Sequence, residues 1–143
     1  MRVRAWISEW LKSRLPAAKT LGQRGEEAAA RFLRRKGYKI VARSSRDSIG
    51  ELDLVAVDGR TVVFVEVKTR QSDAMGNPAE AVDLAKQRKL TRLALGFLKR
   101  HRLLEYPARF DIVAITWPEG KGKPRIEHIE NAFEAVGVEG MHS

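Results

Sequence analysis

The chain has 143 residues, 43% of them hydrophobic, which is enough for one domain with a buried core. Its 27 lysines and arginines exceed its 18 acidic residues, and the net charge of +9 favours a polyanionic partner, nucleic acid before an anionic membrane. The absence of cysteine excludes disulfides and thiolate metal sites, and it fits a reducing, cytoplasmic compartment.

Residues 1–20 form a predicted N-terminal extension, a basic amphipathic helix. Apolar side chains, among them Trp6 and Trp10, recur at helical spacing with arginines and lysines between them. We favour a helix that packs on the domain through its tryptophans. The alternative is a basic arm that binds a phosphate backbone or a membrane surface. No apolar run reaches the roughly 20 residues of a membrane span, so stable membrane insertion is not expected.

Residues 22–36 have the pattern of a helix that ends at Gly37. Glu26 is followed at helical spacing by alanines and a leucine, so it lies on the apolar face of this helix. A glutamate in the first turn also favours the helix dipole, which leaves a purely structural role open. A short strand over residues 38–42 and a polar, basic loop over residues 43–48 are expected to follow.

Residues 50–70 predict two strands joined by a tight turn at Asp58-Gly59, a sequence that suits hairpin turns. A two-residue turn would place Asp53 opposite Phe64, and a four-residue turn would place Asp53 opposite Glu66. Side chains two apart on a strand share a face. In both registers one face therefore carries Glu51, Asp53, Glu66 and Lys68, while Leu52, Leu54 and Ala56 lie on the other.

Three carboxylates and one ammonium on a largely apolar hairpin lose hydration. Buried ion pairs often give no more stability than apolar side chains in the same place would. A Glu66–Lys68 pair that fixes the register would explain part of this set, and Glu51 at the strand entry can be solvated. Asp53 on the same face changes the balance, because carboxylates repel one another unless a cation lies between them. Carboxylates with room for water suit a hard divalent ion such as Mg2+.

Asn77 and Pro78 mark a helix start, as the cap and the first helical residue. Either one helix continues to about residue 102, or a short turn precedes a second start at Asp83. One side of this segment is apolar and the other is strongly basic. A charge run is usually a solvated face, although phosphate also binds well near a helix start, where Lys86 lies.

Two more strands are predicted over residues 109–116 and 126–129, the second at a sheet edge, followed by a helical turn over residues 131–136. The order of helix, strands, long helix and strands is typical of an α/β fold with a central mixed sheet flanked by helices. We therefore expect a single domain over residues 21–136 with a flexible tail over residues 137–143.

Five sequence blocks resemble one bacterial family, UPF0102 or YraN-like, over about residues 20–135. The blocks are Gly22-x-x-Gly25-Glu26, Gly37-Tyr38, Gly50-Glu51-Leu52-Asp53-Leu54, Phe64-Val65-Glu66-Val67-Lys68-x-Arg70 and Arg109-Phe110-Asp111. Asp53 followed by Glu66-x-Lys68 is also similar to the strand signature of a metal-dependent nuclease superfamily. The resemblance implies a restriction-endonuclease-like fold, close to that of the archaeal Holliday-junction resolvases.

The resemblance implies metal-assisted phosphodiester hydrolysis of DNA, with branched or recombination intermediates among the substrates. Asp53 and Glu66 would bind Mg2+ or Mn2+, with Glu26 and the Val67 carbonyl as further ligands. Lys68 would orient the attacking water or stabilise the transition state, so the expected catalytic residues are Asp53, Glu66 and Lys68. Glu51 would hold Lys68 or a water from outside the ligand set. The expected phosphate contacts are Arg24, Arg46, Arg70, Lys86 and Gln87.

Two other functions stay open at this point. The first is a nucleic-acid-binding protein of the same fold with little or no catalytic activity, which would bind DNA or RNA without a divalent ion. The second is a peripheral membrane adaptor that binds through residues 1–15. A branched substrate with two-fold symmetry would suit a homodimer.

Overall fold

The computed structural model describes residues 18–72, 74, 76–118 and 122–137. The predicted N-terminal helix lies outside these residues except for the end of its segment, and so does nearly all of the predicted tail. The elements are helix α2 (Leu21–Arg35), strands β1 (Lys39–Arg46), β2 (Glu51–Asp58) and β3 (Thr61–Arg70), the 3-10 turn η2 (Pro78–Ala81), helix α3 (Leu84–Arg100), and strands β4 (Ala108–Thr116) and β5 (Arg125–Phe133). Within the described ranges, no helix has the length and apolar character that crossing a membrane requires.

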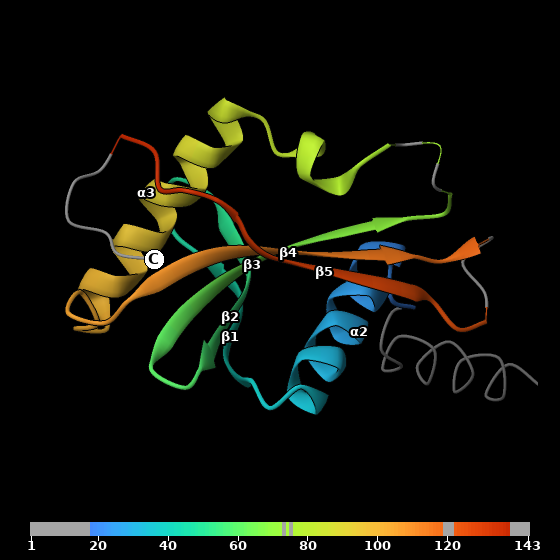
Figure 1. Cartoon of the computed structure of the whole chain (residues 1–143), viewed down its shortest axis with the longest axis horizontal. Helices are drawn as coiled ribbons and strands as arrows, with labels where there is room; N and C mark the ends of the chain where they lie inside the picture. Colours follow the sequence, from blue (N-terminus) through green and yellow to red (C-terminus); the bar gives the residue numbers. More distant parts are fainter. Residues whose placement is uncertain (1–17, 73, 75, 119–121, 138–143) are drawn as a thin grey trace, which may run out of the picture.

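The five strands form one mixed sheet in the order of the sequence, β1-β2-β3-β4-β5. Strands β3 and β4 are parallel, because the chain crosses over through η2 and α3 between them, and the other neighbours are antiparallel. Helices α2 and α3 lie on opposite faces of the sheet (Figure 1). The predicted α/β architecture, a mixed sheet flanked by helices, is confirmed.

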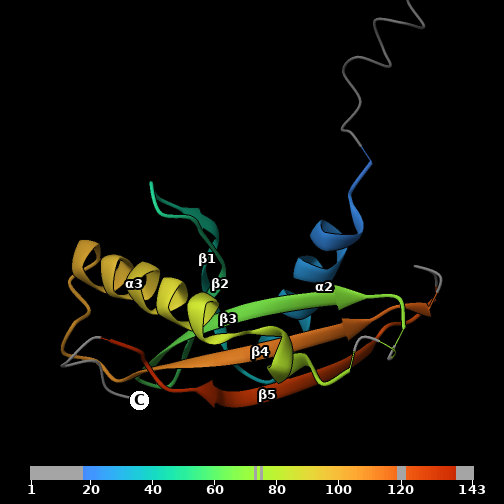
Figure 2. The ribbon, with the colours of Figure 1, turned by 90° about the horizontal axis from the view of Figure 1, so that it is seen from above.

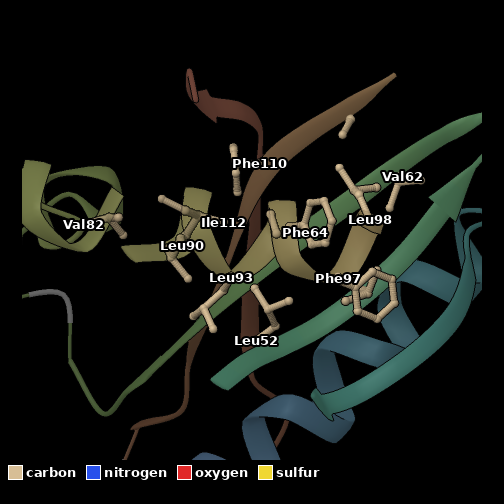
Figure 3. Packing of buried hydrophobic residues seen from close by; sticks show 13 residues of the cluster. Leu52, Val62, Phe64, Val82, Leu90, Leu93, Phe97, Leu98, Phe110 and Ile112 are labelled. Carbon is tan, nitrogen blue, oxygen red and sulfur yellow. The ribbon is translucent and has the colours of Figure 1, made fainter. Parts of the chain in front are cut away.

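Alternate side chains of β3 enter two separate cores, as the period of a strand requires. Phe64 packs beside Leu93 and Phe97 of α3 in the core that Figure 3 shows. Val63 and Val65 pack in the other core with the small and apolar face of α2. Strand β3 is therefore buried on both faces, and a charged residue in it must find partners among protein groups.

Helix α2 begins with a capping box, in which the Thr20 hydroxyl accepts from the backbone N–H of Gln23 and the Gln23 side chain accepts from the N–H of Thr20. Gly25 lets the first turns of α2 approach β3 closely. A Cβ at Gly25 would lie 1.8 Å from the Oγ1 of Thr69, so only glycine permits this distance. The close approach fixes Glu26, the next residue, against the end of β3.

The second of the two possible starts for α3 is the observed one. The turn η2 follows Asn77, whose side chain accepts from the backbone N–H of Ala79. Helix α3 then starts anew after Asp83, whose carboxylate accepts from the backbone N–H of Lys86 at 2.8 Å. This second cap sets the direction of the first turn of α3, from which Lys86 reaches the sheet.

The hairpin between β2 and β3 closes with Asp58 opposite Thr61, so its two-residue turn is Gly59-Arg60, one residue later than the predicted Asp58-Gly59, and Gly59 has φ +62°. The shift of the turn by one residue gives the register that would set Asp53 opposite Glu66, which the sequence predicts only for a four-residue turn. The ladder between β2 and β3, however, ends at the Leu54–Val65 pair. In Figure 2 strands β1 and β2 turn away from the direction of β3, β4 and β5.

Because the strands part there, the predicted alternation of β2 is wrong at its start. Leu52 packs in the α3-side core together with Val55, whereas Leu54 and Ala56 pack in the α2-side core. Residues 52 and 55 cannot share a face in a regular strand. Asp53 lies at this irregularity, at the point where β2 leaves β3.

Three boundaries differ from the expectation. Strand β1 continues to Arg46, through most of the predicted loop 43–48, because its polar residues pair with residues 51–55 of β2 at the sheet edge. Strand β5 runs from residue 125 to residue 133, longer than the predicted 126–129. The predicted helical turn over residues 131–136 is wrong, since residues 131–133 belong to β5, with an irregular register opposite β4.

Candidate functional site

Three carboxylates converge where β2 leaves β3. Glu26 from α2 and Glu51 and Asp53 from β2 each offer an oxygen, and these oxygens lie within 4.8 Å of one another. Two features of the fold bring them together, the close approach of α2 that Gly25 allows and the early end of the β2–β3 ladder. We call Glu26, Glu51 and Asp53 the carboxylate group.

Asp53 is held in place by the strand that it faces. Its Oδ2 accepts from the backbone N–H of Val67 at 2.9 Å. Burial, and then the charge of Glu66, raise the pKa of Asp53 to about 7. Burial and the charge of Glu51 also raise the pKa of Glu26, against a hydrogen bond from the Ser44 hydroxyl that lowers it. Two of the three carboxyls therefore lie where their negative charge is unfavourable.

Glu66 lies beside the carboxylate group but is held by two lysines. Its side chain is only 7% exposed. Its Oε1 lies 3.0 Å from the Nζ of Lys86 on α3 and 3.8 Å from the Nζ of Lys68 on its own strand. The charge of Glu66 still acts on Asp53 and Glu26, whose pKa values it raises. Asp53, Glu66, Lys68 and Glu26 thus lie near one another, although Glu66 is not part of the carboxylate group.

Glu51 lies as near to the site as Glu26 does, although the sequence placed it outside the ligand set. The Arg46 side chain donates to Oε2 of Glu51 from Nη2 at 2.6 Å and from Nε at 3.2 Å. These hydrogen bonds lower the pKa of Glu51. Arg46 therefore neutralises a carboxylate in this structure, and Glu51 stays ionised when Asp53 takes up a proton.

A cleft of about 330 Å³ opens beside Glu26, between the start of α2 and the end of β1. Arg43, Gln23 and Ser44 line it, together with Lys19 and Glu27, which form an ion pair with each other. Arg43 and the polar side chains next to the carboxylates offer partners for a phosphate that approaches the site from this side.

Three other predicted phosphate contacts have partners within the protein. The guanidinium of Arg24 lies 4.1 Å from the ring centroid of Trp117. Arg70 donates from Nε to the Oγ1 of Thr116 at 3.3 Å and from Nη1 to the Gly76 carbonyl. Gln87 donates from Nε2 to the Val82 carbonyl at 3.0 Å, which joins the first turn of α3 to η2. Of the predicted contacts on α3, Lys86 is the one directed at the carboxylates.

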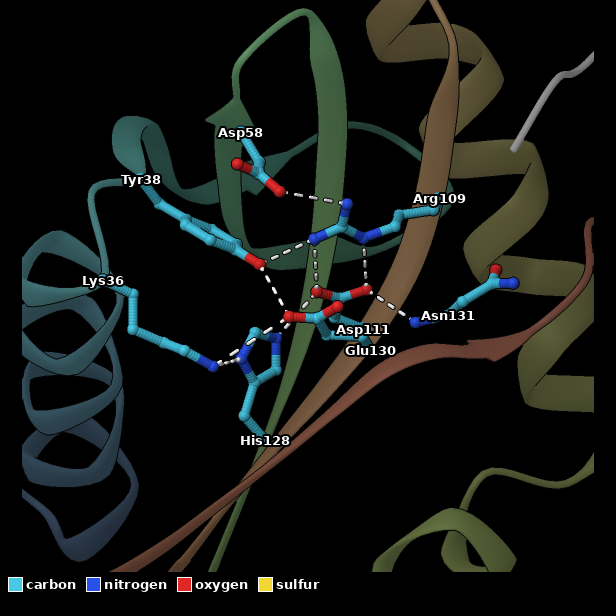
Figure 4. Close-up of polar contacts among 8 residues, drawn as sticks. All are labelled: Lys36, Tyr38, Asp58, Arg109, Asp111, His128, Glu130 and Asn131. Carbon is cyan, nitrogen blue, oxygen red and sulfur yellow. Dashed lines mark hydrogen bonds and ion pairs between the residues drawn. The ribbon is translucent and has the colours of Figure 1, made fainter.

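The sequence reasoning gave no role to a second polar cluster, on the α2 face of the sheet (Figure 4). Its centre is Asp111 of β4, which has no exposed surface. Asp111 accepts from Arg109 Nε at 3.0 Å, from His128 Nε2 at 2.8 Å and from the backbone N–H of Asn131 at 2.9 Å. Burial acts to raise the pKa of Asp111, but these hydrogen bonds, first that of His128, lower it overall.

The remaining members of this cluster tie it to neighbouring elements. The Nζ of Lys36 lies 2.8 Å from Nδ1 of His128, so Nδ1 accepts and Nε2 carries the proton donated to Asp111. Arg109 also donates from Nη2 to the Tyr38 hydroxyl at 2.7 Å, and burial raises the pKa of Tyr38 to about 12. Among the described residues, every buried side-chain nitrogen and oxygen has a partner, so this cluster is a structural support.

The donor set of the first site suits a hard cation. Its ligand candidates are carboxylate oxygens, which Mg2+ and Mn2+ prefer over nitrogen or sulfur. Burial, and then the charge of Glu66, disfavour the ionised form of Asp53, and a divalent ion would favour it. The oxygens of Glu26, Glu51 and Asp53 lie close enough together for such an ion, and Glu66 lies beside them.

Known proteins with similar sequences are described as UPF0102 proteins. A model of the "Uncharacterised protein family UPF0102" matches residues 25–115, which contain every acidic and lysine residue of the site. A UPF0102 protein of Rhodopirellula baltica is 46% identical over 144 residues, 99% of this chain and 86% of that protein. A UPF0102 protein of Geobacter sulfurreducens is 51% identical over 116 residues, 81% of this chain and 90% of the relative. The chain therefore belongs to the uncharacterised protein family UPF0102.

Proposed function

We propose that this protein is a metal-dependent endonuclease that hydrolyses phosphodiester bonds in DNA. The observation that carries the proposal is the convergence of three carboxylate oxygens within 4.8 Å, next to Glu66 and Lys68. Burial, and then the charge of Glu66, raise the pKa of Asp53 to about 7, so an ionised carboxylate at this position is unfavourable as a purely structural feature. A bound Mg2+ or Mn2+ would supply Lewis acidity toward the phosphate and lower the pKa of a water nucleophile.

In this proposal each residue of the site has a role that follows from its position. Asp53 and Glu66, with Glu26, hold the cation, and the Val67 carbonyl is a further oxygen ligand in this proposal. The Val67 N–H already fixes the orientation of Asp53 by donating to Oδ2. Lys68, close to Glu66 on the same strand, orients the attacking water or stabilises the charge that develops on the phosphate oxygens.

DNA as substrate is supported by charge and by the surroundings of the site. The chain carries a net charge of +9, and Arg43 lines the cleft beside Glu26. The signature of Asp53 with Glu66-x-Lys68 resembles that of the restriction-endonuclease-like nucleases, and the five-stranded mixed sheet is consistent with that fold. Fold likeness by itself does not carry function, so the proposal depends on the site.

One observation favours the alternative, a nucleic-acid-binding protein of the same fold with little or no activity. Glu66 is engaged by two lysine ammonium groups, an arrangement that neutralises it without any metal. Such a protein would bind DNA or RNA in a salt-dependent way in the presence of a chelator, and Asp53→Asn would leave that binding unchanged.

A cleavage assay on linear, nicked and four-way DNA with Mg2+, Mn2+ or a chelator separates the two functions. We expect cleavage that needs the divalent ion and that falls at least about 100-fold in Asp53→Asn and Lys68→Met. The matched controls Glu105→Gln and Lys99→Met change exposed residues away from the site and should cut normally. Tight binding without cleavage in the wild type under all these conditions would leave the binding protein as the better account.

A further inference from the structure

Lys86 is placed unusually for a surface lysine. Its Nζ lies 3.0 Å from Oε1 of Glu66, closer than the Nζ of Lys68, which is 3.8 Å away on the neighbouring part of β3. The Lys86 side chain is 40% exposed, whereas Glu66 is 7% exposed. One end of this ion pair is therefore fixed within the fold, and the other reaches it from the solvent side.

The backbone position of Lys86 does not favour its charge. Lys86 lies in the first turn of α3, where the helix dipole is positive, and this turn contains no acidic residue. The carboxylate of the cap residue Asp83 accepts from the Lys86 N–H, so it binds the backbone of Lys86 and not its ammonium. Glu66 is thus the group that holds the ammonium of Lys86 at the site.

Counting charges shows that the two lysines and a divalent ion compete. Glu26, Glu51, Asp53 and Glu66 carry up to four negative charges, and Arg46 on Glu51 together with Lys68 and Lys86 supplies three positive ones. Adding a dication at Glu66 leaves one ammonium in excess, and like charges at such distances repel strongly. Lys86 is the more exposed of the two lysines, 40% against 30% for Lys68, and it reaches Glu66 from another element, whereas Lys68 is on the same strand as Glu66.

Resting on the proposed function, we infer that Lys86 is an exchangeable counter-ion: it neutralises Glu66 in the metal-free protein and leaves when a divalent ion binds there. The released ammonium, on a flexible four-carbon stem at the edge of the site, then donates to a phosphate of the bound DNA. Metal binding and DNA binding become coupled through one side chain. By linkage, each strengthens the other by the same factor.

The first measurement is Mn2+ affinity without DNA, from the EPR signal of the free ion at pH 8. We expect Lys86→Met to bind Mn2+ at least about fivefold more tightly than the wild type, because the competing ammonium is gone. Lys99→Met, which removes an exposed lysine from the last turn of the same helix, should bind Mn2+ as the wild type does. Lys86→Gln repeats the test should the methionine variant fold poorly.

The second measurement is the salt dependence of binding to an intact duplex, in Ca2+ and in a chelator. A phosphate contact contributes about 0.9 to the slope of log affinity against log salt. In Ca2+ the slope of Lys86→Met should be smaller than that of the wild type by about this amount. In the chelator the two slopes should agree, because Lys86 is then held by Glu66 in the wild type.

The outcomes separate this inference from the proposed function. If the wild type binds Mn2+ but Lys86→Met binds it equally or more weakly, Lys86 does not compete with the ion and the exchange is wrong, while the metal site stands. Equal slope differences in Ca2+ and in the chelator would mean that Lys86 contacts phosphate at all times, which also overturns the exchange. A wild type that takes up no divalent ion removes the proposed metal site and the exchange together.

Discussion

Replacing Asp53 with asparagine should stabilise the metal-free protein at pH 8, although the residue belongs to the proposed catalytic site. Asparagine has nearly the same shape, and its oxygen can still accept from the Val67 N–H, which lies 2.9 Å from Oδ2 in the wild type. The substitution removes the charge that burial and Glu66 make unfavourable. Residues of functional sites often cost stability in this way.

The size and sign of the effect follow from the pKa of Asp53, raised from 3.8 to about 7. The folded state binds this proton more tightly than the unfolded state does. The stability that the protonated carboxyl contributes is fully present below about pH 4 and is lost as the pH rises through about 7. A difference of about three pH units corresponds to about 4 kcal/mol, and partial solvent screening at Asp53 reduces this to about 2–4 kcal/mol.

Urea unfolding in the presence of a chelator at pH 4.5, 6 and 8 measures this difference. We expect Asp53→Asn to be more stable than the wild type by about 2–4 kcal/mol at pH 8, and by about a third of that or less at pH 4.5. The control Glu105→Gln, at an exposed position, should show no such dependence on pH. An asparagine variant that is less stable at pH 8, or equally changed at every pH, would refute the convergence of charge at Asp53.

Two further predictions concern the supports of the site. Asp111→Asn should lower the free energy of unfolding by about 3–5 kcal/mol, because Arg109 and His128 lose their charged acceptor; a loss under about 1 kcal/mol in urea unfolding would contradict this. Gly25→Ala should destabilise by about 1–3 kcal/mol, despite the usual preference of helices for alanine, because its Cβ would lie 1.8 Å from the Oγ1 of Thr69. Adding Thr69→Ala should restore part of that loss, and no recovery would mean that the contact is not the cause.

Much of the fold could be predicted because its signals are local. The glycine that ends the first helix at Gly37, the helix start at Asp83 and the apolar run of β3 all lie within a few residues of the structure they specify. The extent of the polar edge strands, β1 and β5, was harder to predict. Most of β1 and β5 lacks an apolar alternation, and their extent depends on pairing with β2 and β4.

The candidate site was only partly predictable for a similar reason. The sequence pairs Asp53 with Glu66 through the hairpin, but it does not contain the break of alternation at Leu52, which follows from packing against α3. The contact between Lys86 and Glu66 joins the start of a helix to a strand 20 residues earlier, and no local sequence pattern predicts it. For Asp111 the sequence does contain one signal, because an acidic residue interrupts an apolar strand. Its partner His128, however, is identified only by the pairing of β4 with β5.

The central claim is that Asp53 and Glu66 hold one divalent ion. Anomalous scattering from a crystal soaked in Mn2+ tests it most directly. The account predicts a peak about 2.0–2.2 Å from carboxylate oxygens of both residues, with the Lys86 ammonium turned away from Glu66. A well-ordered site without such a peak, in which Lys86 still lies on Glu66 at high Mn2+, would contradict it.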